Sequence, residues 1–424
     1  MNLFPPKLDL NKKIVPQNLD ALHYRLKFHW ESSSGMIYRL ERVGGLHPSI
    51  YVYKAEIGHP CVLSRAPLGL HETGGKGTSE MEARISAAAE AVERLSMELQ
   101  GDEEKVKSSY HEIRDRAILP NDYLLFSSEQ YRAREKWNGS CSPRFRVPEP
   151  FDENAAIYWS PLWSLTQNQM RYFPTELCYF VPPHLHQPYF VSDSNGVAAG
   201  SSLEEAVFKG FLELVERDSV SIWWYNRLTV PALDWNGIRD PYLLEMKQYY
   251  ENAGRQIWIL DLTTDWNVPV HAAISAKTDG QNEMVMGFAA DPDRARSRIK
   301  AMTELNQVYC ASETGAYKKD KEICDWLKKA SLKEYPQLHP IFFVAPKMEN
   351  AEIESLADCL KLLERKKMEM LVLDLTREAM GLNVAKVFVP GMRHLRPRFA
   401  AGRLYDVPEK KLMEAKLNQQ PIVF

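Results

Sequence analysis

Several features that would point to a specialised class of protein are missing from this sequence. The six cysteines among the 424 residues stand at least 14 positions apart, so there is no C-x-x-C pair of a redox motif or a zinc ribbon. No stretch approaches the roughly 18 consecutive apolar residues of a membrane span. The opening residues, MNLFPPKLDL, lack the apolar core of a signal peptide. We therefore expect a cytoplasmic protein with reduced thiols and no membrane partner.

An excess of charge of one sign is also missing. The 53 Lys and Arg residues nearly balance the 56 Asp and Glu residues, and no basic run is longer than three. Because nucleic-acid binding depends on a basic surface, this balance argues against nucleic acid as the main partner. Any anionic ligand must be held by a local site. Apolar residues make up 45% of the chain, which is enough for a sizeable core.

Strand-like runs precede helix-like runs repeatedly, which predicts a mixed α/β (α+β) protein. Two long helices are expected to begin after the glycine-rich turns GGKG and SNGVAAG, with Thr78 or Ser79 and Ser201 or Ser202 as N-caps. We expect the following organisation: a loosely ordered lead-in over 1–34 and one large domain over 35–424, with peripheral insertions at about 101–155 and 315–366.

The pattern E-x-x-E-R occurs twice within these two helices, in AAAEAVERLSM (87–97) and GFLELVERDSV (210–220). Residues three, four, seven, eight or eleven apart share a helical face. Each helix therefore presents one polar stripe, comprising Ser86, Glu90, Glu93 and Arg94 in the first and Glu205, Glu213, Glu216 and Arg217 in the second. The repeat, 123 residues apart, predicts two related halves that enclose one site.

Four converging glutamates would repel one another unless cations held them. Their oxygens suit Mg²⁺, which commonly bridges to substrate phosphates, and Arg94, Arg217 and Lys76 would meet those phosphates. The alternative is that both stripes are solvated charge pairs on surface helices, and spacing alone leaves the two readings about equally open. GGKG lacks the spacing of a P-loop. A third stripe in KAMTELNQ, with Lys300, Glu304 and Gln307, is by itself an ordinary polar helix face.

Together, GKGTSEMEARISAAAEAVERLS, SNGVAAGSSLEEAVFKGFLELVERD and KAMTELNQ resemble the YcaO family in order and separation. They contain the family's S-x3-E-x2-E-R and E-A-x6-E-x2-E-R-D patterns, and the resemblance extends over about 35–424. It implies a fold that binds ATP without a P-loop and coordinates Mg²⁺ with glutamates of paired helices. It also implies an enzyme that phosphorylates a peptide-bond oxygen.

Carried over by position, the resemblance implies a site of eleven residues. The carboxylates of Glu90, Glu93, Glu213 and Glu216 would bind Mg²⁺. Arg217 and Lys300 would neutralise charge during phosphoryl transfer. The nucleotide-binding set would be Ser86, Arg94, Glu205, Arg217, Lys300, Glu304 and Gln307. This sequence departs from many relatives at Lys300, which is often arginine there, and at Ala198 and Ser201 near the adenosine contacts.

The segment VPGMRHLRPRFAAGRLYDVP resembles that of YcaO cyclodehydratases, which turn Cys, Ser or Thr of a ribosomal precursor peptide into thiazoline or oxazoline rings. Many of these enzymes end in Pro-x-Pro-x-Pro, whereas LNQQPIVF keeps only Pro421. The carboxylate of Phe424 and His394 are candidates for the general base, although a lone histidine is more often structural. The alternatives are a thioamide- or amidine-forming YcaO enzyme and an inactive docking scaffold.

The resemblance also implies partners. Nothing before residue 35 has the length of a leader-binding domain, so a separate E1-like (ThiF-like) protein is expected to deliver the precursor peptide. Some systems of this kind add an FMN-dependent azoline dehydrogenase. A homodimer is expected on the same ground.

Overall fold

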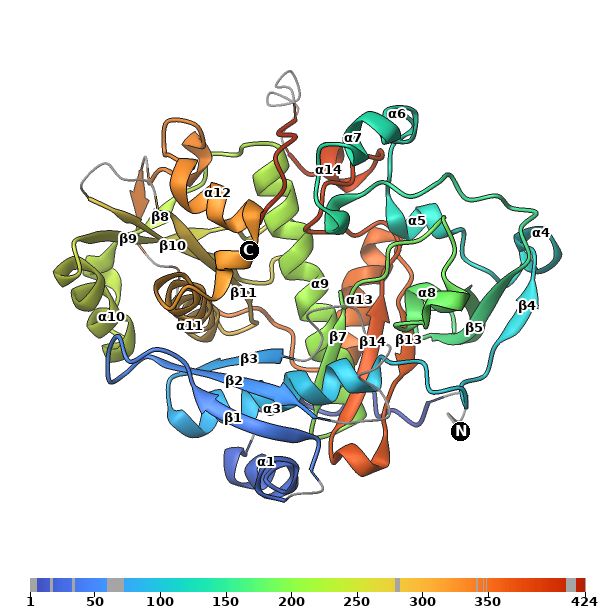
Figure 1. The fold of residues 1–424 in the computed structure, drawn as a ribbon, viewed down its shortest axis with the longest axis horizontal. Coiled ribbons are helices and arrows are strands. Elements are labelled where there is room, and N and C mark those ends of the chain that lie inside the picture. The colour runs from blue at the N-terminus through green and yellow to red at the C-terminus, as the bar shows by residue number, and fades with distance from the viewer. Residues whose placement is uncertain are drawn as a thin grey trace.

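In the computed structural model, the strands pack around one long helix, α9 (Figure 1). The structure describes residues 6–15, 18–32, 35–58, 72–278, 283–340, 342–345, 347, 349–408 and 417–423. Within these ranges the strands form three sheets. Figure 1 shows α9 (Leu203–Tyr225) in the middle, between two of the sheets, with the third sheet below it.

The three sheets are largely antiparallel. The first has the order β1–β2–β3. The second has the order β11–β10–β9–β8–β12, in which only the β8–β12 pair is parallel among the described strands. The third has the order β4–β5–β13–β14–β7, with β6 paired to β5. The strands are β1 (Ile37–Arg42), β2 (Tyr51–Ile57), β3 (Glu72–Gly77), β4 (Val106–Ser108), β5 (Ile157–Ser164), β6 (Gln169–Pro174), β7 (Val197–Gly200), β8 (Ala232–Leu233), β9 (Arg255–Asp261), β10 (Val270–Lys277), β11 (Val285–Ala290), β12 (Phe343–Val344), β13 (Leu371–Asp374) and β14 (Asn383–Phe388).

Three long helices each follow a strand directly or after a short turn: α3 after β3, α9 after β7 and α11 after β11. The other helices are shorter and lie mostly toward the periphery in Figure 1. The helices are α1 (Leu19–Leu26), α2 (Phe28–Glu31), α3 (Glu80–Ser96), α4 (Tyr110–Ile113), α5 (Pro120–Leu124), α6 (Ser128–Arg132), α7 (Arg134–Asn138), α8 (Thr175–Cys178), α9, α10 (Pro241–Asn252), α11 (Arg294–Glu313), α12 (Lys321–Lys329), α13 (Leu356–Lys366) and α14 (Arg403–Asp406).

Strand β3 contains the GGKG stretch, so the expected glycine-rich turn is wrong. Its residues pair with β2 instead, with Gly75 opposite Tyr53. The glycines are needed because α3 packs closely over this strand. A Cβ on Gly75 would lie 2.2 Å from the carbonyl oxygen of Ala83 and the backbone nitrogen of Ala87. The second expected turn is also partly a strand, since Val197–Gly200 forms β7.

Both long helices begin at a predicted serine cap. The Ser79 side chain accepts a hydrogen bond from the backbone N–H of Glu82, and the Ser202 side chain accepts one from that of Glu205. The helices differ in burial, because 8 of the 17 residues of α3 are buried but 18 of the 23 residues of α9. Three charged residues of α9, Glu204, Glu205 and Asp218, are therefore buried, and each needs a partner.

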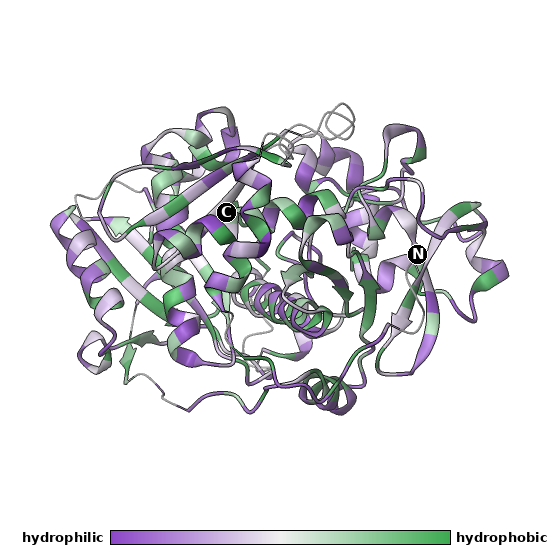
Figure 2. Ribbon diagram, turned by 90° about the horizontal axis from the view of Figure 1, so that it is seen from below, coloured by the Kyte–Doolittle hydropathy of each residue, from purple (hydrophilic) through white to green (hydrophobic). Residues whose placement is uncertain are grey.

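The hydrophobic core surrounds these helices. One cluster joins α9 to β10, β11 and α13, a second joins α3 to β5, β13 and β14, and a third lies between β9, α10 and α11. In Figure 2 the inner strands are mostly green, and the peripheral helices show more purple, hydrophilic residues. No helix in the described part of the chain is long and apolar enough to cross a membrane.

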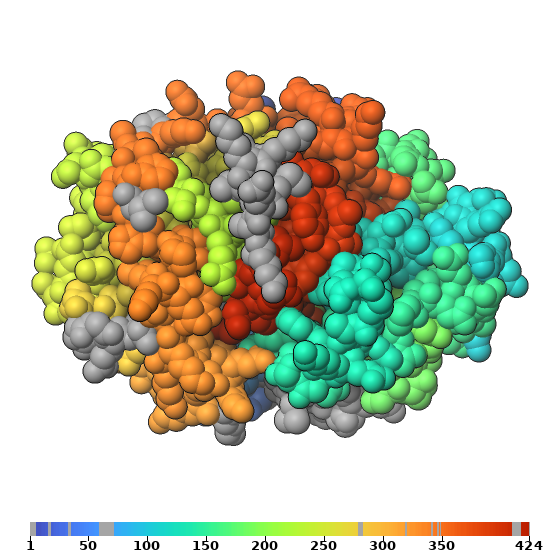
Figure 3. All heavy atoms as spheres, turned by 90° about the horizontal axis from the view of Figure 1, so that it is seen from above, coloured from blue at the N-terminus to red at the C-terminus, as the bar shows by residue number. Residues whose placement is uncertain are grey.

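The lead-in is more ordered than expected, because residues 19–31 form α1 and α2 and α1 packs against α3. The predicted insertions reach the surface on either side of the red C-terminal segment in Figure 3. Both also contribute buried side chains, including Tyr123 of the first and Trp326 of the second. Their boundaries and those of the main domain stay predictions.

Candidate active site

The glutamates of α3 receive hydrogen bonds from two sheet edges. One oxygen of Glu90 accepts from the backbone N–H of Gly74 on β3 at 3.2 Å, and the other from Arg94 at 3.0 Å. Glu93, one turn before the end of the helix, accepts from the backbone N–H of Ala199 on β7 at 2.7 Å. The first polar stripe therefore lies where β3 and β7 both meet α3.

On α9, the carboxylates of the second stripe are held in two groups. Glu205 accepts hydrogen bonds from the backbone N–H of Ser201 at 2.9 Å and from its hydroxyl at 2.6 Å, and pairs with Lys209 at 3.0 Å. Two turns further on, the guanidinium of Arg217 lies 3.4 Å from Glu213 and 3.6 Å from Glu216. Every carboxylate of this stripe thus faces a cation.

Helix α11 adds a third polar surface. Glu304 pairs with Lys76 of β3 at 2.5 Å, which links α11 to the first sheet. Gln307 lies directly over β3, because a Cβ on Gly74 would come within 2.2 Å of its side-chain nitrogen. Lys300, one turn before Glu304, instead pairs with the buried Asp291 at 2.7 Å. Glu304 and Gln307 therefore reach the first sheet, whereas Lys300 is tied to Asp291.

The carboxylates of the three helices are close enough to change one another's pKa. Burial raises the pKa of Glu93 to about 8, and the carboxylates of Glu90 and Glu213 add to the rise. Burial also raises the pKa of Glu216 to about 7; Arg217 opposes this rise, whereas Glu304 and Glu213 increase it. Since these effects connect α3 to α9 and α9 to α11, the sequence-predicted glutamates converge on one site.

The residues present fit a Mg²⁺–nucleotide group. Among the described residues, no three His, Cys, Asp or Glu side chains form a ready-made metal cage. Mg²⁺ does not require one, because it commonly takes one or two carboxylates and completes its shell with water and phosphate oxygens. Crowded carboxylates with raised pKa values would be relieved by such a cation. Beside them, Lys76 and Arg217 supply the positive charge that a phosphate needs.

Of the other predicted residues, Ser86 is half-buried on α3, one turn before Glu90. Arg94 is paired with Glu90, so its charge is already directed at a carboxylate. His394 is buried: one ring nitrogen faces the amide of Asn195 at 2.8 Å and the other the carbonyl of Tyr123 at 2.9 Å. Both nitrogens are occupied, as expected for a structural histidine. Phe424, the other candidate for the general base, lies outside the described residues.

The sequence motifs did not reveal a buried ion-pair network behind Arg217. Asp218 is fully buried and accepts hydrogen bonds from the indole of Trp266 at 2.8 Å and the backbone N–H of Arg393 at 2.8 Å. The guanidinium of Arg403, within the C-terminal GRLYDVP segment, binds the same carboxylate at 2.6–3.0 Å. Asp218 thereby anchors the C-terminal segment to the helix that bears the site. The one signal for this role in the sequence is the position of Asp218, which follows the E-x-x-E-R pattern and stands within an apolar run.

Comparison with known proteins identifies the family. Residues 74–393 match the family model described as YcaO cyclodehydratase, ATP- and Mg²⁺-binding. The chain therefore belongs to the YcaO family. The family match confirms the expected enzyme class and the cofactors ATP and Mg²⁺. The mixed fold is confirmed by the similar solved structures.

Three solved structures are similar to this chain. A heterocyclase in complex with substrate and cofactor is 33% identical, with a TM-score of 0.89 over 100% of this chain and 60% of its own. The heterocyclase TruD is 38% identical, with a TM-score of 0.68 over 80% of this chain and 50% of its own. The YcaO protein of Methanopyrus kandleri bound with AMPPCP and Mg²⁺ is 23% identical, with a TM-score of 0.62 over 95% of this chain and 94% of its own, and shows the fold alone.

This chain thus spans 60% of one heterocyclase chain and 50% of the other.

Proposed function

We propose that this chain is an ATP- and Mg²⁺-dependent cyclodehydratase that converts Cys, Ser or Thr of a ribosomal precursor peptide into thiazoline or oxazoline. The observation that carries the proposal is the convergence of carboxylates from α3, α9 and α11 beside Lys76 and Arg217. ATP supplies a phosphoryl group, which makes an amide oxygen a good leaving group. Its transfer requires positioning and charge neutralisation rather than a covalent step on the protein.

The metal-binding role falls to Glu90, Glu93, Glu213 and Glu216. The argument is that these four carboxylates are crowded and only partly compensated by Arg94 and Arg217. Backbone N–H groups of Gly74 and Ala199 fix Glu90 and Glu93 in place, so little rearrangement is needed to receive a cation.

The nucleotide-binding role falls to Ser86, Arg94, Glu205, Arg217, Lys300, Glu304 and Gln307. Arg217 is best placed to face phosphate, because its guanidinium lies between the two glutamates of α9. Lys300 keeps 53% of its side chain exposed beside Asp291, so its ammonium can turn from that carboxylate to a phosphate. We assign these two residues to charge neutralisation during phosphoryl transfer.

The substrate supplies the nucleophile. In this reaction the side chain of Cys, Ser or Thr attacks the carbon of the preceding amide, and the amide oxygen becomes the phosphorylated group that leaves as phosphate. No residue of the chain needs to form a bond to the peptide. We propose, on the ground of the family resemblance, a separate leader-binding E1-like partner that delivers the peptide. We also expect a homodimer and, as a later step, an FMN-dependent azoline dehydrogenase.

Reconstitution tests the proposal. The chain is incubated with ATP, Mg²⁺, the partner and the precursor peptide, and the peptide is weighed by mass spectrometry. Loss of one water per modified Cys, Ser or Thr supports ring formation. Exchange of an oxygen for sulfur when sulfide is supplied would reassign the chain to thioamide formation. An unchanged peptide that still binds the chain would indicate a docking scaffold.

A matched pair of variants tests the metal assignment. Glu216→Gln removes a carboxylate that is 13% exposed in the site, whereas Glu251→Gln removes one that is 45% exposed on α10. We expect ATP turnover to fall by about 10²-fold or more only in Glu216→Gln. Full turnover with Glu216→Gln would refute the metal assignment.

A further inference from the structure

Lys209 lies inside the polar stripe of α9, although the sequence motifs gave it no role. It follows Glu205 by one helical turn and precedes Glu213 by one, so all three side chains share a face. Its ammonium lies 3.0 Å from the carboxylate of Glu205 and donates to the carbonyl oxygen of Ala199 at 3.2 Å. The same Ala199 residue holds Glu93 through its N–H. Lys209 is therefore fixed at the junction of the nucleotide and metal sets.

The ammonium of Lys209 has one donor left. A lysine carries three N–H donors, and the two contacts described above account for two of them within the described residues. Its side chain keeps 36% of its surface exposed, so the remaining donor is open to a ligand. Glu205, in contrast, is only 7% exposed behind it. The ammonium of Lys209 is thus paired with a buried carboxylate and still accessible to a ligand.

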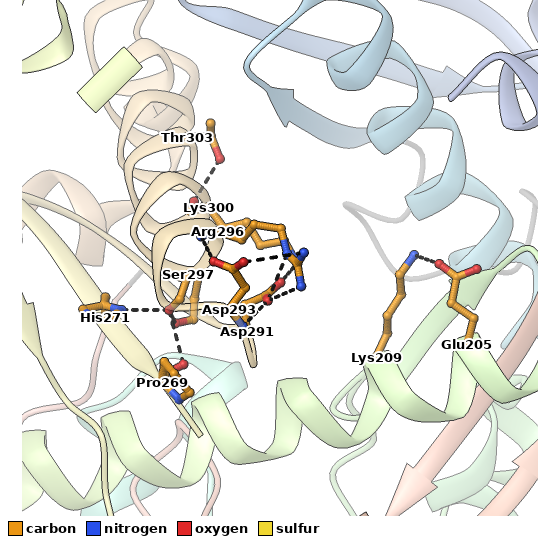
Figure 4. Close-up of polar contacts among 11 residues, drawn as sticks. Glu205, Lys209, Pro269, His271, Asp291, Asp293, Arg296, Ser297, Lys300 and Thr303 are labelled. Carbon is orange, nitrogen blue, oxygen red and sulfur yellow. Dashed lines mark hydrogen bonds and ion pairs between the residues drawn. The ribbon is translucent and has the colours of Figure 1, made fainter. Parts of the chain in front are cut away.

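Helix α11 supplies two further cations near the site. Lys300 and Arg296 are 53% and 48% exposed and both pair with Asp291, which is 5% exposed. In Figure 4, Lys209 rises from α9 with its ammonium turned toward Glu205, while Lys300 and Arg296 extend from α11 toward Asp291. Partly exposed cations on two helices, each held by a buried carboxylate, form a favourable environment for a polyanion.

We propose that Lys209 is an additional nucleotide-binding residue, which binds the β- and γ-phosphates of ATP from the side opposite Lys300. This inference rests on the function proposed above and adds a residue to its site. The position next to Glu213 and Glu93 favours the outer phosphates, because Mg²⁺ bridges these same oxygens in nucleotide sites. Glu205 and the carbonyl of Ala199 hold the ammonium in its orientation before the nucleotide arrives, which reduces the entropic cost of binding.

Calorimetric titration of the full chain with AMPPCP or AMP, in the presence of Mg²⁺, tests this role without requiring turnover. We expect Lys209→Gln to weaken AMPPCP binding by about tenfold or more, since a charged hydrogen bond is lost. The same variant should bind AMP within about twofold of the wild type, because AMP lacks the outer phosphates. Lys209→Arg should retain most of the affinity for AMPPCP.

Lys247→Gln is the matched control, because Lys247 forms an equivalent i,i+4 pair with Glu251 at 2.8 Å on α10, outside the site. It should leave both affinities unchanged. Equal losses for AMP and AMPPCP in Lys209→Gln would overturn the proposal, since Lys209 would then act by positioning Glu205. Unchanged AMPPCP affinity would overturn it too.

A wild-type chain that binds no AMPPCP would instead refute the proposed function itself. If Lys209→Gln does not fold, Lys209→Met, which keeps the length of the side chain without its charge, takes its place. A selective loss of AMPPCP affinity in that variant supports the phosphate contact, and equal losses for AMP and AMPPCP refute it.

Discussion

Arg94 on α3 and Arg217 on α9 occupy the same position of the same sequence pattern, but their side chains meet different surroundings. Among the residues that the structure describes, Arg94 pairs with one carboxylate, that of Glu90 at 3.0 Å, and both side chains are about one-third exposed. Arg217 lies between Glu213 and Glu216. Burial of Arg217 disfavours its charged form, but the charges of Glu216, Glu213 and Glu304 outweigh this effect and raise its pKa above the usual range. The two copies of the pattern therefore have different tasks.

The residue that follows each arginine extends the contrast. On α3 it is Leu95, which packs in the apolar core. On α9 it is Asp218, whose buried carboxylate binds Arg403, Trp266 and the backbone of Arg393. Most of α9 is buried, so its charges pair inside the molecule, whereas the outer charges of α3, such as Glu80 and Glu82, pair near the surface with Tyr53 and Thr78. Repetition of a motif thus does not imply equal importance of its members.

The largest expected difference is in catalysis. Arg217→Gln should lower peptide-dependent ATP turnover by about 10²–10³-fold, because it removes a positive charge beside the phosphate and leaves Glu213 and Glu216 to repel each other. Arg94→Gln should lower turnover by less than about tenfold, since Arg94 is paired with a single carboxylate. Phosphate release at saturating precursor peptide measures both. Equal losses in the two variants would remove the contrast between the copies.

The next largest effect concerns stability. Asp218→Asn should destabilise the chain by about 3–5 kcal/mol, because it leaves Arg403 partly buried without its main counter-charge. Urea unfolding followed by tryptophan fluorescence measures this. Asp265→Asn is the control, since Asp265 also pairs with Arg403 but is 40% exposed, and we expect it to cost less than about 1 kcal/mol. A loss below 1 kcal/mol in Asp218→Asn would show that the network does not hold the C-terminal segment.

A smaller effect depends on pH. It contrasts Glu98, a partly buried carboxyl whose pKa is shifted by burial alone, with Asp218, which is paired with Arg403. Burial alone raises the pKa of Glu98, just after α3, to about 7. Between pH 4.5 and 7 the folded chain therefore keeps a proton that the unfolded chain releases, so the free energy of unfolding falls as pH rises through this window. Glu98→Gln should remove this contribution. Across the window, the free energy of unfolding of the variant should then fall by about 1–2 kcal/mol less than that of the wild type.

Urea unfolding at several pH values measures the slope. Glu112→Gln serves as the control, because hydrogen bonds from Ser109 and Ser108 hold the pKa of Glu112 below its usual value. In the upper part of the window that carboxyl is ionised in both states, so its removal should leave the slope there unchanged. An identical slope in wild type and Glu98→Gln would show that the Glu98 carboxyl is solvated in the folded chain.

The smallest effect is expected for the stability of Arg94→Gln. Partly exposed i,i+4 ion pairs contribute only a few tenths of a kcal/mol, so the free energy of unfolding should change by less than about 0.5 kcal/mol. Arg132→Gln, which breaks an exposed pair with Glu129 at 2.5 Å, should behave alike. A loss above about 2 kcal/mol in Arg94→Gln alone would mean that the copy on α3 is as deeply integrated as the copy on α9.

Much of the fold was predictable from local patterns. The serine caps at Ser79 and Ser202 and the helical stripes follow from side-chain periodicity and capping chemistry, which act over a few residues. The GGKG stretch was misjudged, because glycine most often indicates a turn. Here it serves the close packing of α3 on β3, and that contact forms only in the tertiary structure.

The partners of the charged residues were beyond local reasoning. Lys300 pairs with Asp291 and Lys76 with Glu304, although 228 residues separate the second pair along the chain. Lys209 belongs to the site, yet it occupies a variable position of the second motif. Spacing tells which side chains share a helical face, but not which face of another element they meet.

The sequence by itself determined that two helices carry glutamate stripes with an arginine, and that the chain resembles the YcaO family in three ordered motifs. Helical periodicity and the capping residues are sufficient for that. Only the tertiary structure decided that Arg217 lies between two carboxylates while Arg94 meets one, and that Asp218 binds the C-terminal segment through Arg403. The physical reason is burial: the strength of a charge interaction depends on how much water the surrounding elements exclude, and those elements come from distant parts of the chain.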